Sequence, residues 1–132
     1  MKFLLDTDTC IYALKQNLAV LKNLLARVPE DVAVSVITEA ELRTGAAKSS
    51  SAAKTLRLVE NFLRPIAILD FTSNDAASYA QIRARLERAG TPIGPLDTLI
   101  AVQAVVRKLV LVSNNQREFG RVAGRHTQNW AN

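Results

Sequence analysis

Short runs of apolar residues alternate along this chain with longer stretches in which apolar positions recur every three or four residues. The four apolar runs span residues 2–5, 32–36, 66–69 and 109–112. Runs of this length without polar alternation are typical of strands that are buried on both faces of a sheet. The pattern therefore predicts four short strands at these positions.

The stretches between the runs carry helical periodicity and helix end signals. In the first of them, apolar residues recur at a spacing close to 3.6 between Leu14 and Val28. Pro65 closes the third predicted helix, Gly90 ends the fourth, and Pro95 suits the first position of the fifth. The five predicted helices span residues 9–28, 38–49, 51–64, 73–90 and 95–109.

Strands that alternate with helices predict an α/β fold with a mostly parallel sheet. We expect four to five short central strands flanked by helices. The length of 132 residues is that of one domain and is sufficient for a hydrophobic core. We found no repeat, linker or low-complexity segment, so residues 1–132 are assigned to a single domain.

Cysteine content and apolar run lengths bear on the compartment. The single cysteine, Cys10, excludes an internal disulfide and favours a reducing environment. No apolar run approaches the ~20 residues of a membrane-spanning helix. Asp6 and Asp8 interrupt the apolar start of the chain, unlike a signal peptide. We therefore expect a cytoplasmic protein with no membrane partner.

The formal net charge of +5, from 17 Lys and Arg against 12 Asp and Glu, favours an anionic partner such as nucleic acid. Aromatic residues make up only 5% of the chain, so phosphate contacts are expected to dominate over base stacking. The candidate phosphate-binding cations are Arg43, Lys48, Arg117, Arg121 and Arg125. The last three recur every four residues and would share one face of a helix, although a solvated face is the alternative.

Four acidic residues fall at equivalent ends of the predicted elements. Asp6 ends the first strand, Glu41 lies early in the helix after the second, Asp97 lies early in the last predicted helix, and Glu118 follows the fourth strand. The carboxyl ends of parallel strands share one edge, where ligands bind. Clustered carboxylates stay ionised when a cation neutralises them, and oxygen-only ligands suit Mg²⁺ or Mn²⁺.

Each acid also has a purely structural interpretation. Asp6 can cap a helix, and Thr38 with Glu41 matches a capping-box pattern. Asp97 can complement the dipole of a helix N-terminus, and Glu118 can be a solvated surface acid. Four such acids at equivalent positions nevertheless favour a shared site.

Other chemistries have little support in the sequence. His126 is the sole histidine. It cannot supply both the general acid and the general base of a metal-free ribonuclease. No nucleophile elbow or phosphate-binding glycine loop occurs. The segment "DTDTC" approaches the nucleophile motif of haloacid-dehalogenase-type phosphatases, but Cys10 stands where that motif has Thr. The acid pair that such enzymes need is missing, since Glu118 is the only acid after Ser113.

Four segments in order resemble the conserved blocks of the VapC family of PIN-domain toxins. They are "FLLDTDTCIY", "SVITEAELRTGA", "GTPIGPLDTLIAVQA" and "LVLVSNNQREFGRV". The resemblance extends to the closing "HTQNW". It implies a metal-dependent endoribonuclease that acts on RNA, with tRNA and in particular the initiator tRNA anticodon loop favoured. It also implies a VapB-type antitoxin partner and a homodimer within a toxin–antitoxin complex that binds operator DNA through the antitoxin.

The same resemblance assigns roles to individual residues. The first three acids of the family fall on Asp6, Glu41 and Asp97. The fourth falls on Glu118 or, in other relatives, at the position of Asn115, and we favour Glu118. The resemblance implies that Asp6 and Asp97 bind Mg²⁺, or Mn²⁺, directly and that Glu41 and Glu118 complete the site through water.

Two positions depart from the usual family pattern. Position 8 is Asp rather than Asn, which adds a negative charge beside the site, and Ser113 replaces Thr while keeping the hydroxyl.

Two questions stay open at this point. A catalytically inactive, PIN-like protein that binds RNA or regulates expression would share the fold. The apolar residues Leu56, Val59 and Leu63 form either a homodimer face or part of the core.

Overall fold

The computed structural model describes residues 1–124 and 126–132, so Arg125, one of the expected cations, lies outside the described residues. Its centre is a five-stranded parallel sheet in the order β3-β2-β1-β4-β5. The strands are β1 (Phe3–Leu5), β2 (Val32–Ser35), β3 (Ala67–Leu69), β4 (Val110–Val112) and β5 (Thr127–Gln128). The predicted α/β fold with a parallel sheet is confirmed.

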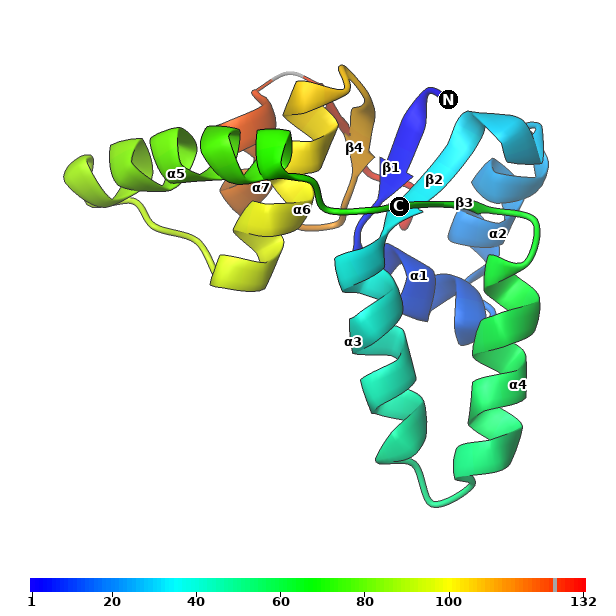
Figure 1. Ribbon diagram of the computed structural model, residues 1–132. Helices are drawn as coiled ribbons and strands as arrows, with labels where there is room; N and C mark the ends of the chain where they lie inside the picture. The colour runs from blue at the N-terminus through cyan, green and yellow to red at the C-terminus, as the bar shows by residue number, and fades with distance from the viewer. Residues whose placement is uncertain (125) are drawn as a thin grey trace.

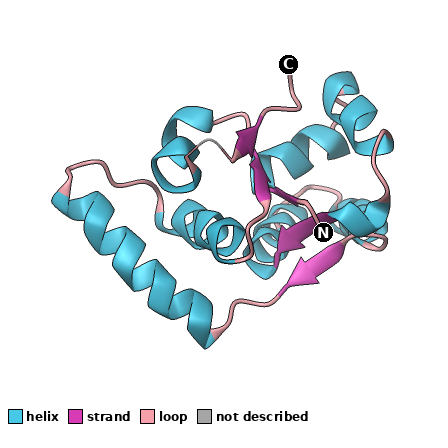
Figure 2. Cartoon of the chain, turned by 90° about the horizontal axis from the view of Figure 1, so that it is seen from above, coloured by secondary structure: helices cyan, strands magenta, loops and turns pink. Residues whose placement is uncertain are grey.

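Helices cover both faces of this sheet (Figures 1 and 2). The helices are α1 (Thr7–Leu14), α2 (Leu18–Leu25), α3 (Val36–Ala47), α4 (Ala52–Leu63), α5 (Ser73–Arg88), α6 (Pro95–Val106) and α7 (Gln116–Ala123), with a 3-10 turn at Pro29–Asp31. Among the described residues, no helix is long and apolar enough to span a bilayer.

Alternate residues of the strands enter two separate cores. Leu5 and Val34 pack with residues of α1, α2, α3 and α4 on one face, where Val59 and Leu63 are also buried. Leu4 packs with residues of α6 and α7 on the other face. Val59 and Leu63 therefore belong to the core of the monomer, and the partly buried Leu56 packs against the same core, which supports the core interpretation.

The single helix predicted over residues 9–28 is wrong, because the chain breaks there into α1 and α2. Gln16 adopts a left-handed conformation with φ of 66°, which ends the first helix. The Asn17 side chain then accepts a hydrogen bond from the Val20 N–H at 3.0 Å and caps the second helix. Apolar residues on both sides of the break keep the helical spacing, which is why periodicity alone did not reveal it.

The capping-box interpretation of Thr38 and Glu41 is also wrong. Helix α3 begins two residues earlier than expected, and the Ser35 hydroxyl caps it by accepting from the Ile37 N–H at 3.0 Å. Thr38 consequently lies inside the helix with its side chain buried. This leaves the Glu41 carboxylate available for other contacts.

A buried ion pair joins α5 to the end of α6. Asp75 forms a capping box with Thr72 at the start of α5 and is only 1% exposed. Arg107 binds both Asp75 oxygens, at 2.8 and 2.9 Å, and also donates to the Asp70 carbonyl. Burial alone would raise the pKa of Asp75, but the Arg107 guanidinium holds it below its usual value.

Pro95 begins α6, as predicted. The C-terminal end of α6 leads back into the start of β4, which runs parallel to β1, so the N-terminus of α6 lies toward the edge where β1 and β4 end (Figure 1).

Candidate active site

The carboxyl edge of the sheet holds the first expected acid. Asp6 directly follows β1, is 3% exposed, and accepts a hydrogen bond from the Thr9 N–H at 2.8 Å as the cap of α1. Burial raises the pKa of Asp6, while hydrogen bonds from Ser113 and Thr9 act in the opposite direction. Asp6 is therefore both a helix cap and a buried acid at the end of a strand, so the two interpretations are compatible.

The pKa of Asp97 reflects its burial and the negative charge around it. Asp97 lies in the first turn of α6, and its pKa is raised to about 6. Burial is the main cause, and the negative charges of Glu41, Asp6, Asp8 and Glu118 add to it. The structure thus brings all four expected acids, and Asp8 with them, into one electrostatic environment.

Within the described residues, none of these five acids forms an ion pair with a cationic side chain. The ion pairs in the described part of the chain involve Asp31, Glu39, Asp75 and Glu87, and none involves an acid of the site. Within residues 1–124 and 126–132, no three His, Cys, Asp or Glu side chains are arranged to hold one metal ion together. Mg²⁺ commonly uses only one or two carboxylates and keeps several waters, so an oxygen-only pair such as Asp6 and Asp97 fits it.

Glu41 is held by a residue that the sequence analysis missed. The Thr7 hydroxyl, in the first turn of α1, donates to Glu41 Oε1 at 2.7 Å and lies 3.1 Å from the Thr38 hydroxyl. Thr7 is 8% exposed. Because a hydroxyl carries one proton, the shorter contact takes it, and Thr38 can donate to Thr7 in turn. No local signal marks this contact, since Thr7 and Glu41 are 34 residues apart.

Glu118 and Asn115 are the two candidates for the fourth acidic position of the site, and their surroundings differ. Asn115 is exposed and caps α7, where its side-chain oxygen accepts from the Glu118 N–H at 3.4 Å. The half-buried Glu118 lies in the first turn of α7 and contributes to the raised pKa of Asp97. Its position agrees with our choice of Glu118, and its role in catalysis stays a prediction.

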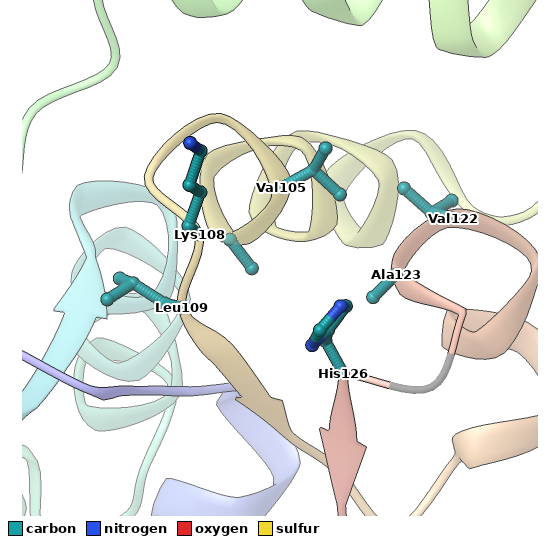
Figure 3. Close-up of a pocket in the computed structure, with 7 residues that line it drawn as sticks. Val105, Lys108, Leu109, Val122, Ala123 and His126 are labelled. Atoms are coloured by element: carbon teal, nitrogen blue, oxygen red, sulfur yellow. The ribbon is translucent and has the colours of Figure 1, made fainter.

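His126 and Cys10 lie apart from this chemistry. His126 precedes β5 and, with Lys108 and Leu109, lines a mostly apolar cavity of about 460 Å³ at the opposite, amino edge of the sheet (Figure 3). Cys10 is fully buried in the core, which raises the pKa of its thiol.

Comparison with known proteins agrees with this geometry. The sequence model of the PIN domain matches residues 3–125. A protein from Shigella flexneri named tRNA(fMet)-specific endonuclease VapC is 39% identical over 131 residues, 99% of each chain. A crystal structure of DNA-bound VapBC from Salmonella typhimurium contains a chain with a TM-score of 0.92 at 40% identity, over 98% of both chains. A crystal structure of VapBC2 from Rickettsia felis, bound to a promoter DNA fragment, contains a chain with a TM-score of 0.91 at 33% identity, over 98% of this chain and 99% of the other.

The fold is that of a PIN domain, and the chain belongs to the PIN-domain family and, within it, to the VapC group. This membership removes the basis for the phosphatase hypothesis, which rested on short segments around Asp6 and Ser113.

Proposed function

We propose that this protein is the toxin of a type II toxin–antitoxin pair and acts as a Mg²⁺-dependent endoribonuclease. The observation that carries the proposal is the group of acids around Asp97, which together with burial raises the pKa of that residue and forms no ion pair among the described residues. Unbalanced carboxylates at the ligand-binding edge of a parallel sheet suit a divalent cation. The name of the Shigella flexneri relative supports the same activity.

Two of the acids would bind the metal ion and two would orient water. Asp6 and Asp97 would hold the ion directly, and Mn²⁺ is the alternative to Mg²⁺. When bound, the ion supplies a Lewis acid for the scissile phosphate and lowers the pKa of a water. Asp97 gives up its proton before it can serve as a ligand, so its pKa of about 6 makes ion binding stronger as pH rises through that value. Glu41, fixed by Thr7, and Glu118 would orient water at the site.

The favoured substrate is tRNA, and the initiator tRNA anticodon loop in particular. Support comes from the name of the Shigella flexneri protein, which specifies tRNA(fMet). An RNA loop also presents unpaired nucleotides that a protein can splay open, which a duplex does not. Because water rather than the 2′-hydroxyl attacks, we expect products with 3′-hydroxyl and 5′-phosphate ends.

A VapB-type antitoxin is the proposed protein partner. An apolar groove of about 320 Å³ runs between α1, α3 and α4, and Glu41 lies among its lining residues. An amphipathic helix of a partner can place its apolar face in such a groove. The partner could then extend a basic side chain toward the acids. The solved VapBC complexes support this pairing, and their DNA supports binding of operator DNA by the complex, which we propose contains a homodimer of this chain.

A catalytically inactive RNA-binding protein is the alternative function. Such a protein would gain nothing from five acids beside a bound phosphate, because they would repel it. The deciding experiment expresses the wild type and Asp97→Asn in bacterial cells without an antitoxin and sequences RNA fragments that carry 5′-phosphates. We expect growth arrest and new tRNA ends with the wild type alone. Equal growth and identical RNA ends in both cultures would support the inactive alternative.

A further inference from the structure

An acidic active site needs cations nearby if it is to hold an RNA backbone. Four arginines on α5 and α7 meet this need, and we call them the arginine surface: Arg85, Arg88, Arg117 and Arg121. None of the four forms an ion pair with a carboxylate in the part of the chain that the structure describes, whereas Arg43, Arg83 and Arg107 all do. Their charge is therefore available to an external anion.

Hydrogen bonds to the backbone hold two of these side chains in place. Arg85 donates to the Arg121 carbonyl at 3.4 Å, and Arg121 donates to the Pro92 carbonyl at 3.4 Å. These contacts connect α5, α7 and the loop before α6. Each guanidinium has five N–H donors, so most of them stay free for phosphate oxygens.

Two chain segments connect the arginine surface to the acids. Pro92, which Arg121 contacts, lies in the loop that leads into α6 and Asp97. Arg117 directly precedes Glu118 in the first turn of α7. Figure 1 shows α5, α6 and α7 gathered on one side of the sheet, while the α3–α4 pair projects on the other side. The apolar groove lies on the α3–α4 side.

We propose that the arginine surface binds the phosphate backbone of the RNA substrate and guides the scissile phosphate to the acids. This inference rests on the proposed ribonuclease function and identifies the surface along which the RNA reaches the acids. The two sides of the acidic site then have different partners, with RNA on α5 and α7 and the antitoxin in the apolar groove between α1, α3 and α4. Phosphate contacts of this kind fix position and carry little sequence information.

The test measures RNA binding separately from cleavage. The double variant Arg85→Gln/Arg88→Gln is placed in the Asp97→Asn background, and tRNA affinity is measured by fluorescence anisotropy at several NaCl concentrations. The matched control is Arg57→Gln/Arg64→Gln, which removes two exposed arginines from the α4 region and gives the same net charge. Thermal melts establish that both variants are folded.

We expect the α5 variant to bind tRNA about tenfold more weakly, with a salt slope smaller by about 0.7 for each phosphate that it no longer neutralises. The control should stay within about twofold of its parent, since its arginines lie away from the RNA path. Equal reductions of affinity in the two variants would overturn the proposal, because net charge alone would then explain them. So would unchanged tRNA affinity with weaker antitoxin binding, which would assign the arginine surface to the protein partner.

RNA cleavage by the same two double variants, measured with Asp97 restored, distinguishes failure of this inference from failure of the proposed function. The α5 variant should cleave slowly at limiting RNA and recover at saturating RNA. If the wild type cleaves no RNA, the ribonuclease proposal fails, while the binding measurement still decides whether the arginine surface contacts nucleic acid.

Discussion

Replacing Thr7 by valine removes one proton donor from the site and little else. Valine keeps the branched shape of threonine, and the Thr7 hydroxyl has two partners, Glu41 Oε1 at 2.7 Å and the Thr38 hydroxyl at 3.1 Å. After Thr7→Val the Glu41 carboxylate is free to rotate, and the buried Thr38 hydroxyl is left without this partner. We therefore expect both slower cleavage and lower stability.

The size of the effect follows from the charge and burial of the partners. A hydrogen bond to a charged group contributes roughly 1.5–3 kcal/mol. Glu41 is only half-buried, so water can replace part of the Thr7 hydrogen bond, and the low end of that range applies. A loss of about 1.4 kcal/mol in transition-state stabilisation corresponds to about a tenfold lower cleavage rate.

Thr44→Val is the matched control. Thr44 lies on the same helix as Glu41, is exposed, and donates its hydroxyl to the Ala40 carbonyl at 2.8 Å, away from the acids of the site. This variant should change stability by less than about 1 kcal/mol and keep its cleavage rate within about twofold. Thr7→Ser should recover most of the activity because it restores the donor.

The assay is single-turnover cleavage of a tRNA substrate at saturating Mg²⁺, with urea unfolding to measure stability. Cleavage by Thr7→Val at the wild-type rate would show that Thr7 does not position Glu41 for catalysis. An equal rate loss in Thr44→Val would also exclude that role, since a general effect of replacing a threonine by valine would then suffice.

Three further predictions concern the acids and the ion pair. Glu118→Gln should lower the single-turnover cleavage rate at least about tenfold, while Asn115→Ala should mainly remove a helix cap at a cost of about 1 kcal/mol in urea unfolding. If Asn115→Ala cleaves more slowly than Glu118→Gln, the assignment of the fourth acid to Glu118 is wrong. Asp97→Asn in EDTA should raise the melting temperature at pH 7.5, because the raised pKa of Asp97 means that its ionised form destabilises the fold above about pH 6. That gain should disappear below about pH 4, where the carboxyl is protonated in both folded and unfolded chains, and a pH-independent gain would contradict the raised pKa. Arg107→Ala should cost about 3 kcal/mol in urea unfolding at pH 7, because it leaves the buried Asp75 carboxylate unpaired, and a cost below about 1 kcal/mol would mean that water replaces the arginine.

The sheet and the acids were predictable because both depend on local sequence order. Short apolar runs between helical stretches indicate parallel strands, and in such a sheet Asp6 must lie at the carboxyl edge. Besides burial, the charges of Glu41, Asp6 and Glu118 raise the pKa of Asp97, as expected for acids that lie at one edge of the sheet. Their catalytic roles stay predictions.

Other features depend on contacts that a single sequence does not display. The break at Gln16 leaves the apolar spacing intact on both sides, so no periodicity signal marks it. Strand β5 has two residues, Thr127–Gln128, and its polar character gave no apolar run to detect. The Thr7 contact with Glu41 joins residues on different helices, and it became visible only when the fold placed α1 beside α3.

The proposed activity requires that the acids around Asp97 form a metal-dependent site that cuts RNA. The decisive measurement incubates the purified wild-type protein with initiator tRNA in Mg²⁺ and in EDTA, with Asp97→Asn in Mg²⁺ as the control, and maps the product ends. We expect cleavage by the wild type in Mg²⁺ alone, with 5′-phosphate and 3′-hydroxyl ends. Full cleavage in EDTA, or cleavage by Asp97→Asn at the wild-type rate, would contradict the proposed site.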